Sequence, residues 1–134
     1  ENAKSIDMRE YIYNMPTVMA AADVIISRAG ASSCNEIGAS GTPCILIPSP
    51  NVTNDHQTKN ARILAQRGGA VLLPEQPDMG KKIYDTVMEL LSDPQRLSQM
   101  SATVRKAVVL DSAEQICDKI ETLFGLRPGG KYGK

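Results

Sequence analysis

Three short, nearly continuous apolar segments recur along this chain, and each is followed by a longer segment with helical periodicity. The segments are residues 23–27 (DVIIS), 43–48 (PCILIP) and 70–73 (AVLL). Strands with such unbroken apolar runs are typical of parallel sheets, because helices cover both faces of the sheet. The pattern therefore predicts an α/β fold with a parallel sheet, flanking helices and right-handed crossovers.

The remaining elements follow from apolar spacing and from end signals. Residues 11–13 form a possible additional strand at the start, so that the predicted order is βαβαβαβ followed by a helical C-terminal part. Ser32 or Ser33 is the expected N-cap of the second helix, and Gly41 fits its end. The predicted helices span residues 16–22, 32 or 33 to 39, 54 or 55 to 67, 79–91, a segment opening at Pro94, and 112–124.

Composition limits the classes of partner. The chain has 134 residues, 15 basic and 15 acidic side chains, so it lacks the excess of positive charge that favours nucleic-acid binding, and we expect no nucleic-acid partner. No apolar run approaches the roughly 20 residues that cross a bilayer, and the first residues do not resemble a secretory signal. The three cysteines are odd in number and widely spaced, which favours a reducing, cytoplasmic location. We expect one domain over residues 1–124 and a flexible tail over 125–134.

The loop after the first convincing strand has the residues of an anion site. In residues 27–36 (SRAGASSCNE) a glycine and small or hydroxylated side chains separate a buried strand from a helix start. Exposed N–H groups and the helix dipole would favour a diphosphate there, and Arg28 could add a charge-assisted bond. Glu36, one turn further on, could accept hydrogen bonds from ribose hydroxyls. Alternatively, Ser33 and Glu36 form a capping box, which needs the same spacing.

A second polar motif, residues 54–61 (NDHQTKNA), begins the next helix at the same end of the sheet. His56 and Gln57 offer donors and acceptors for a second ring of hydroxyls. In the alternative interpretation Asp55 caps the helix, His56 and Gln57 are solvated, and Asn60 only packs. His56 is the only histidine, and the chain has no G-x-S-x-G elbow, P-loop or dinucleotide fingerprint, so we expect no catalytic residue, metal site or cofactor.

Together these motifs resemble the MurG family of UDP-N-acetylglucosamine transferases. R-x-G-A-x-[ST]-x-x-E, a PxILIPxP strand and D-H-Q-x-x-N-A occur in the family's order, within a match over about residues 11–75. The resemblance implies the C-terminal, donor-binding half of a GT-B enzyme with a partial Rossmann-like sheet. It implies that the bound donor is UDP-N-acetylglucosamine (UDP-GlcNAc) and that the sugar is transferred with inversion and without a metal.

The resemblance also implies roles for particular residues. The backbone of Ile12 would meet uracil, Arg28 and Gly30 would shape the diphosphate loop, and Glu36 would hold the ribose. The residues lining the diphosphate would be Ala31, Ser32 and Ser33, and those contacting the N-acetylglucosamine would be His56 and Gln57.

The sequence departs from the family by lacking its N-terminal acceptor half and the first strand and glycine-rich loop of the C-terminal half. We therefore expect a fragment that binds donor but does not transfer sugar alone. The complete enzyme would act at the cytoplasmic face of the bacterial inner membrane. Its acceptor there would be undecaprenyl-pyrophosphoryl-MurNAc-pentapeptide, so that lipid I becomes lipid II. A bare sheet edge would permit a homo-oligomer.

Three other functions are compatible with the motifs. A split UDP-GlcNAc transferase would use such a chain as its donor-binding subunit. A UDP-sugar 2-epimerase shares the fold but should carry more carboxylates and histidines in its cleft. A non-catalytic nucleotide-sugar-binding module would retain the site without the reaction.

Overall fold

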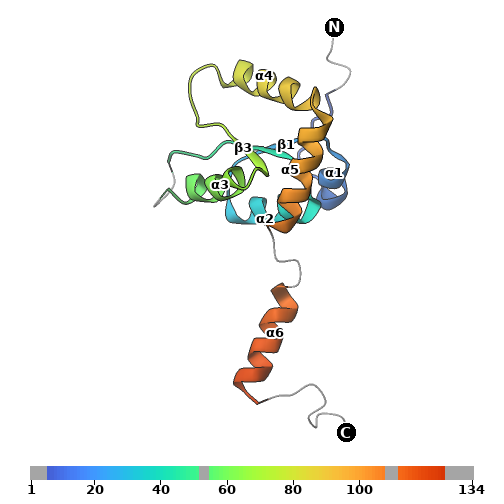
Figure 1. Ribbon diagram of the computed structural model, residues 1–134, viewed down its shortest axis with the longest axis vertical. Coiled ribbons are helices and arrows are strands. Elements are labelled where there is room, and N and C mark those ends of the chain that lie inside the picture. The colour runs from blue at the N-terminus through green and yellow to red at the C-terminus, as the bar shows by residue number, and fades with distance from the viewer. Residues whose placement is uncertain (1–5, 52–54, 108–111, 126–134) are drawn as a thin grey trace.

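A computed structural model describes residues 6–51, 55–107 and 112–125 of the chain. Figure 1 shows a small parallel sheet with helices on both of its faces and a final helix standing away from it. The elements are α1 (Met15–Ala21), β1 (Ile25–Ser27), α2 (Ala31–Ser40), β2 (Cys44–Leu46), α3 (His56–Gln66), β3 (Ala70–Leu72), α4 (Met79–Leu91), α5 (Pro94–Lys106) and α6 (Ser112–Leu123).

The sheet has the order β1-β2-β3, and both strand pairs are parallel. Ile45 at the centre of β2 lies opposite Ile26 on one side and Val71 on the other. The ladder continues past the strand ends, since the N–H of Ile47 donates to the carbonyl of Ser27 in β1 and the N–H of Leu73 donates to the carbonyl of Leu46 in β2, both at 2.9 Å. The predicted α/β class with a parallel sheet and flanking helices is confirmed.

Two apolar clusters lie on the two faces of the sheet. Cys44 and Leu46 point to one face, and the residues packed there are Ala29, Ile37, Ala61, Leu64, Ala70 and Val104. Ile45 points to the other face with Leu73, Leu90 and Met100. This alternation along β2 follows from the period of two in a strand. All three β2 residues are fully buried, as predicted for a central parallel strand.

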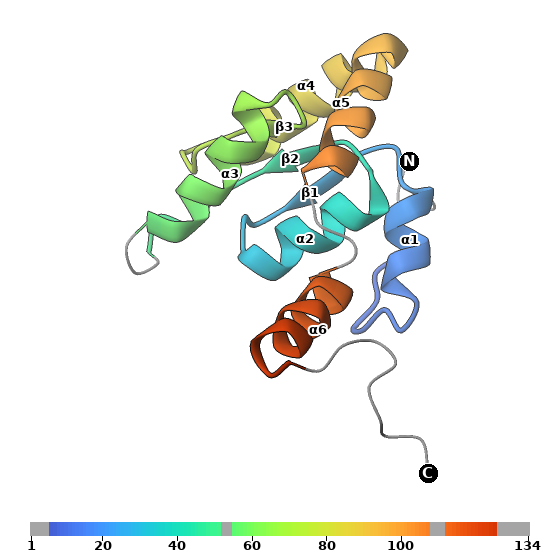
Figure 2. The same ribbon diagram turned by 60° about the horizontal axis from the view of Figure 1, so that its bottom comes forward.

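The helices form two layers around this sheet. α1, α2 and α3 lie on the Cys44 face, and α4 lies on the Ile45 face (Figures 1 and 2). α5 contributes Met100 to one cluster and Val104 to the other, so it joins the two layers. Asp93 caps α5 by accepting a 2.9 Å hydrogen bond from the N–H of Arg96. The loops that follow β1 and β2 begin at the carboxyl ends of these strands, between the two helix layers.

Two sequence-based expectations about the elements are wrong. Residues 11–13 form no strand: Tyr11 and Tyr13 are exposed and pack against each other edge-to-face, with 4.8 Å between ring centroids. Residues 11–13 therefore lack the buried side chains that a strand of this sheet would need. Neither Ser32 nor Ser33 caps α2, because the helix already begins at Ala31 with Gly30 at the N-cap position.

Two other predictions fall partly or wholly outside the described residues. Asn54 lies outside them, and Asp55 occupies the N-cap position of α3 in a left-handed conformation without a side-chain cap hydrogen bond. The predicted flexible tail, except for Gly125, also lies outside them. Among the helices that the structure describes, none is long and apolar enough to cross a membrane.

Candidate functional site

The loops after β1 and β2 meet at one edge of the sheet, because the carboxyl ends of parallel strands lie together. The loop after β1 leads into α2 and the loop after β2 leads to α3. The side-chain amide of Asn60 in α3 donates a 3.1 Å hydrogen bond to the carbonyl of Ala29 in the first loop. Asn60 therefore links the two motifs directly, and the interpretation in which it only packs is wrong.

The start of α2 has free backbone donors. Its N-cap is Gly30, no side chain caps it, and its first turn carries no acidic residue. The first helical bond runs from Cys34 N–H to Gly30 carbonyl, at 2.9 Å, so the N–H groups of Ala31, Ser32 and Ser33 precede the helical ladder. A methyl group on Gly30 would meet only the Ser33 hydroxyl, at 3.7 Å. This open helix end can accept an anion.

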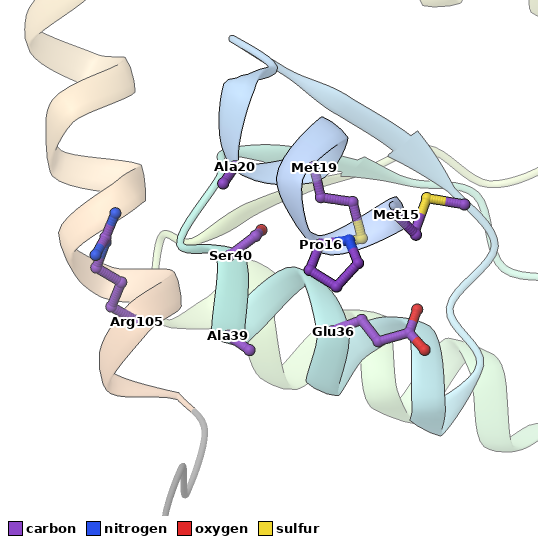
Figure 3. A pocket seen from close by; sticks show the side chains of 8 residues that line it. All are labelled: Met15, Pro16, Met19, Ala20, Glu36, Ala39, Ser40 and Arg105. Carbon is purple, nitrogen blue, oxygen red and sulfur yellow. The ribbon is translucent and has the colours of Figure 1, made fainter. Parts of the chain in front are cut away.

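Glu36 lies on the side of α2 that faces α1. It borders a hollow of about 460 Å³ whose other lining residues are Met15, Pro16, Met19, Ala20, Ala39, Ser40 and Arg105. Figure 3 shows the Glu36 carboxylate at the Met15 end of this hollow and Arg105 at the opposite end. In the described part of the chain Glu36 has no hydrogen-bond or ion-pair partner. Because Ser33 is inside the helix, the capping-box interpretation of Glu36 is wrong.

The first turn of α3 presents His56 and Gln57. His56 is exposed at the first helical position. Gln57 is half-buried, and its Oε1 accepts a 2.9 Å hydrogen bond from the N–H of Ser49, in the loop after β2. The amide group of Gln57 is thus held against the strand end, and among the described residues its two N–H donors have no acceptor.

Arg28 has partners that the motif analysis did not assign to it. Its guanidinium donates to Oε2 of Glu75 at 2.7 Å and to the carbonyl of Ile47 at 3.4 Å. The hydrogen bond from Arg28 and its positive charge lower the pKa of Glu75, and the hydrogen bond to Glu75 raises the pKa of Arg28. Glu75 follows β3, and only its position after a third predicted strand could have indicated that it lies at this edge.

The predicted site residues do not all line one hollow. Glu36 borders the hollow beside α1, whereas Ser27 and Arg28 border a separate hollow of about 340 Å³ with Glu75. Ile12 is half-buried in the segment before α1. No group of three histidine, cysteine, aspartate or glutamate side chains within the described ranges could hold a metal ion.

A parallel sheet with two polar helix starts at its carboxyl edge defines the class of Rossmann-like α/β domains that bind ligands at this edge. Residues 1–116 match the family model described as "Glycosyltransferase family 28 C-terminal domain". The chain therefore belongs to this glycosyltransferase family.

Curated relatives agree with this membership. Two are UDP-N-acetylglucosamine–N-acetylmuramyl-(pentapeptide) pyrophosphoryl-undecaprenol N-acetylglucosamine transferases. The one from Latilactobacillus sakei is 42% identical over 85% of this chain and 31% of its own length. The one from Salinibacter ruber is 43% identical over 85% of this chain and 30% of its own length.

A solved structure has the same fold. The crystal structure of MurG from Acinetobacter baumannii superposes with a TM-score of 0.71 at 29% identity, covering 84% of this chain and 32% of that chain. The chain thus spans about a third of the length of these proteins.

Proposed function

We propose that this chain is the donor-binding part of an inverting glycosyltransferase that moves N-acetylglucosamine from UDP-GlcNAc to lipid I, forming lipid II. The names of the relatives support the substrate and the reaction. The single observation that carries the proposal is the hydrogen bond between Asn60 and Ala29, which joins two uncapped helix starts at one sheet edge.

The ligand would extend along that edge. The diphosphate would accept hydrogen bonds from the N–H groups of Ala31, Ser32 and Ser33, which precede the helical ladder. Glu36 would accept hydrogen bonds from both ribose hydroxyls, because its carboxylate has no partner in the described chain. The backbone of Ile12 would meet uracil in the segment before α1.

The sugar would lie toward α3. His56 is exposed, and the Oε1 of Gln57 accepts from Ser49, while its two amide N–H donors have no acceptor within the part of the chain that the structure describes. When the bond to the anomeric carbon breaks, negative charge develops on the departing UDP, and the start of α2 would stabilise that charge. The diphosphate loop, shaped by Arg28 and Gly30, would keep those donors in place.

The acceptor and the catalytic base would belong to an acceptor-binding half outside these residues. The domain, which we place at residues 1–124, would bind donor and would not transfer sugar alone. With its acceptor half, the enzyme would work at the cytoplasmic face of the bacterial inner membrane, where lipid I presents its sugar. β1 is an edge strand, so an upstream strand or a second copy of the chain could pair with it.

Calorimetric titration of UDP and UDP-GlcNAc into the chain tests donor binding. We expect wild type to bind both, and Glu36→Gln to weaken UDP binding about tenfold or more, since two hydroxyls lose a charged acceptor. Glu89→Gln is the matched control, because Glu89 is an exposed carboxylate paired with Arg96 on the neighbouring helix. Absence of binding to wild type, or equal affinities for the two variants, would refute the donor site.

A further inference from the structure

One ion pair in the described chain joins residues far apart in sequence, namely the pair between Arg28 and Glu75. The other pairs connect neighbouring residues or adjacent helices: Arg9 with Asp7, Lys81 with Asp85, and Arg96 with Glu89. Residue 28 directly follows β1, and residue 75 lies shortly after β3. The pair therefore crosses the end of the central strand.

Arg28 links the ends of all three strands. Its own backbone follows β1, it donates to the carbonyl of Ile47 just beyond β2, and it donates to Glu75 beyond β3. The hollow beside it is lined by Ile26, Met79 and Ile83, which places this contact on the α4 face of the sheet. The Arg28 guanidinium therefore lies across the strand ends, on the face of the sheet opposite α2.

The next residue, Ala29, is held from the other face. Its carbonyl accepts from Asn60 of α3, and its side chain is fully buried in the cluster beneath α2 and α3. Two successive residues are therefore held from opposite faces of the sheet. Gly30 and the first turn of α2 follow at once, so these contacts lie directly before the free N–H groups of that turn.

We propose that Glu75 is a positioning residue: by holding Arg28 it aligns the first turn of α2 with the diphosphate of a nucleotide sugar. This inference rests on the proposed function. In this arrangement Arg28 supports the loop and does not contact the diphosphate. Glu75 has no contact with the ligand and acts only through Arg28.

The expected effect is moderate. The Arg28 and Glu75 side chains are 52% and 41% exposed, so solvent screens their attraction. A half-exposed pair of this kind corresponds to a change of up to about fivefold in an equilibrium constant. We therefore expect Glu75→Gln to weaken UDP binding about threefold to fivefold. Glu75→Asp, which keeps the charge, should recover part of the affinity.

Two measurements separate positioning from general stability. The first is the affinity of the 134-residue chain for UDP, measured for wild type, Glu75→Gln, Glu75→Asp and the control Glu89→Gln. The second is the amide NMR spectrum without ligand. We expect Glu75→Gln to shift the amide signals of Gly30 and Ala31 and to leave the α5 signals unchanged, whereas Glu89→Gln leaves the loop signals unchanged.

A double-mutant cycle tests whether Glu75 acts through Arg28. We expect Arg28→Met, Glu75→Gln and the double variant to have similar affinities, because each removes the same contact. A further loss when Arg28→Met is added to Glu75→Gln would show that Arg28 binds phosphate directly and would overturn the inference. Unchanged Gly30 and Ala31 signals in Glu75→Gln would also overturn it, whether or not wild type binds UDP. Absence of wild-type binding would instead refute the proposed function.

Discussion

At the scale of single residues, burial separates the three thiols of this chain. Cys44 is fully buried in the central strand, and its thiol lies 3.8 Å from the carbonyl of Gly69. Burial, with a smaller contribution from Cys34, raises the pKa of Cys44 to about 12, and burial also raises the pKa of Cys34. Cys117 is exposed on α6. The thiolate is the reactive form of cysteine. Burial keeps reagents away from Cys44, and its raised pKa keeps the thiol protonated, so both protect Cys44 from modification.

We expect a thiol reagent such as a disulfide dye to modify Cys117 rapidly and Cys44 only after unfolding. The measurement is mass-spectrometric mapping of modified sites over time at about pH 8, where an ordinary thiol is partly ionised. Addition of denaturant should make all three sites react. Rapid modification of Cys44 in the folded chain would contradict its burial in the central strand.

Glu75 should make stability depend on pH. Its pKa is lowered from the ordinary 4.5 by the hydrogen bond and charge of Arg28. A lowered folded-state pKa contributes stability that is present above 4.5 and is lost as the pH falls through the folded value. Wild type should therefore melt above Glu75→Gln near pH 7, and the difference should shrink as the pH is lowered below 4.5 and through the folded-state pKa, as measured by thermal denaturation. A difference that persists at the lower pH would exclude ionisation of Glu75 as its cause.

The sequence shows which residues lie at the strand ends more clearly than it shows how they pair. Strand and helix periodicity predicted that Arg28, Glu36 and Gln57 lie near one edge, and the structure confirms the parallel sheet and the order of the elements that carry them. The partner of Arg28 was missed, because Glu75 is 47 residues away and only the three-strand order brings them together. The shared spacing of a capping box and a ribose site likewise left Glu36 ambiguous until the start of α2 was known.

At the scale of elements, α2 shows why helix ends differ in predictability. Its C-terminal end was predicted correctly, because Gly41 has a left-handed φ of 71°, which other residues rarely adopt. Its start was not, because Gly30 has an ordinary extended conformation and no side chain marks the cap. The three strands were predicted because a strand that is buried on both faces requires a continuous apolar run, and such runs are easy to find in the sequence.

Gly41→Ala should destabilise the chain by about 1–2 kcal/mol, because alanine is strained at this φ. The added methyl group would also come within 2.2–2.7 Å of the Arg105 side chain, which would have to move. Gly80→Ala is the matched control: Gly80 lies in α4 with open space around it, so that the change should be neutral or stabilising by up to ~1 kcal/mol. Urea denaturation of both variants measures the difference. Equal stabilities would show that Gly41 is not required by its conformation.

At the scale of the whole molecule, the buried core ends with α5. Val104 is fully buried against the sheet, whereas the apolar side chains of α6 remain exposed, Ile116 by 57%, Ile120 by 46% and Leu123 by 81%. Figures 1 and 2 show α6 as a separate rod beyond α2. Sequence periodicity predicted this helix, but periodicity cannot indicate whether an apolar stripe is covered by the same sheet.

Removal of residues 108–134 should therefore leave the melting temperature within about 2 °C of the complete chain, because α6 removes little apolar surface from water here. Val104→Ala is the contrasting change. It deletes two buried methyl groups between α5 and the sheet. The free energy of unfolding should fall by about 2 kcal/mol and the melting temperature by ~5–10 °C. Calorimetry on the three proteins tests both expectations. A large loss on truncation would mean that α6 packs on the α/β body in solution, and the stable unit would then extend beyond Ala107.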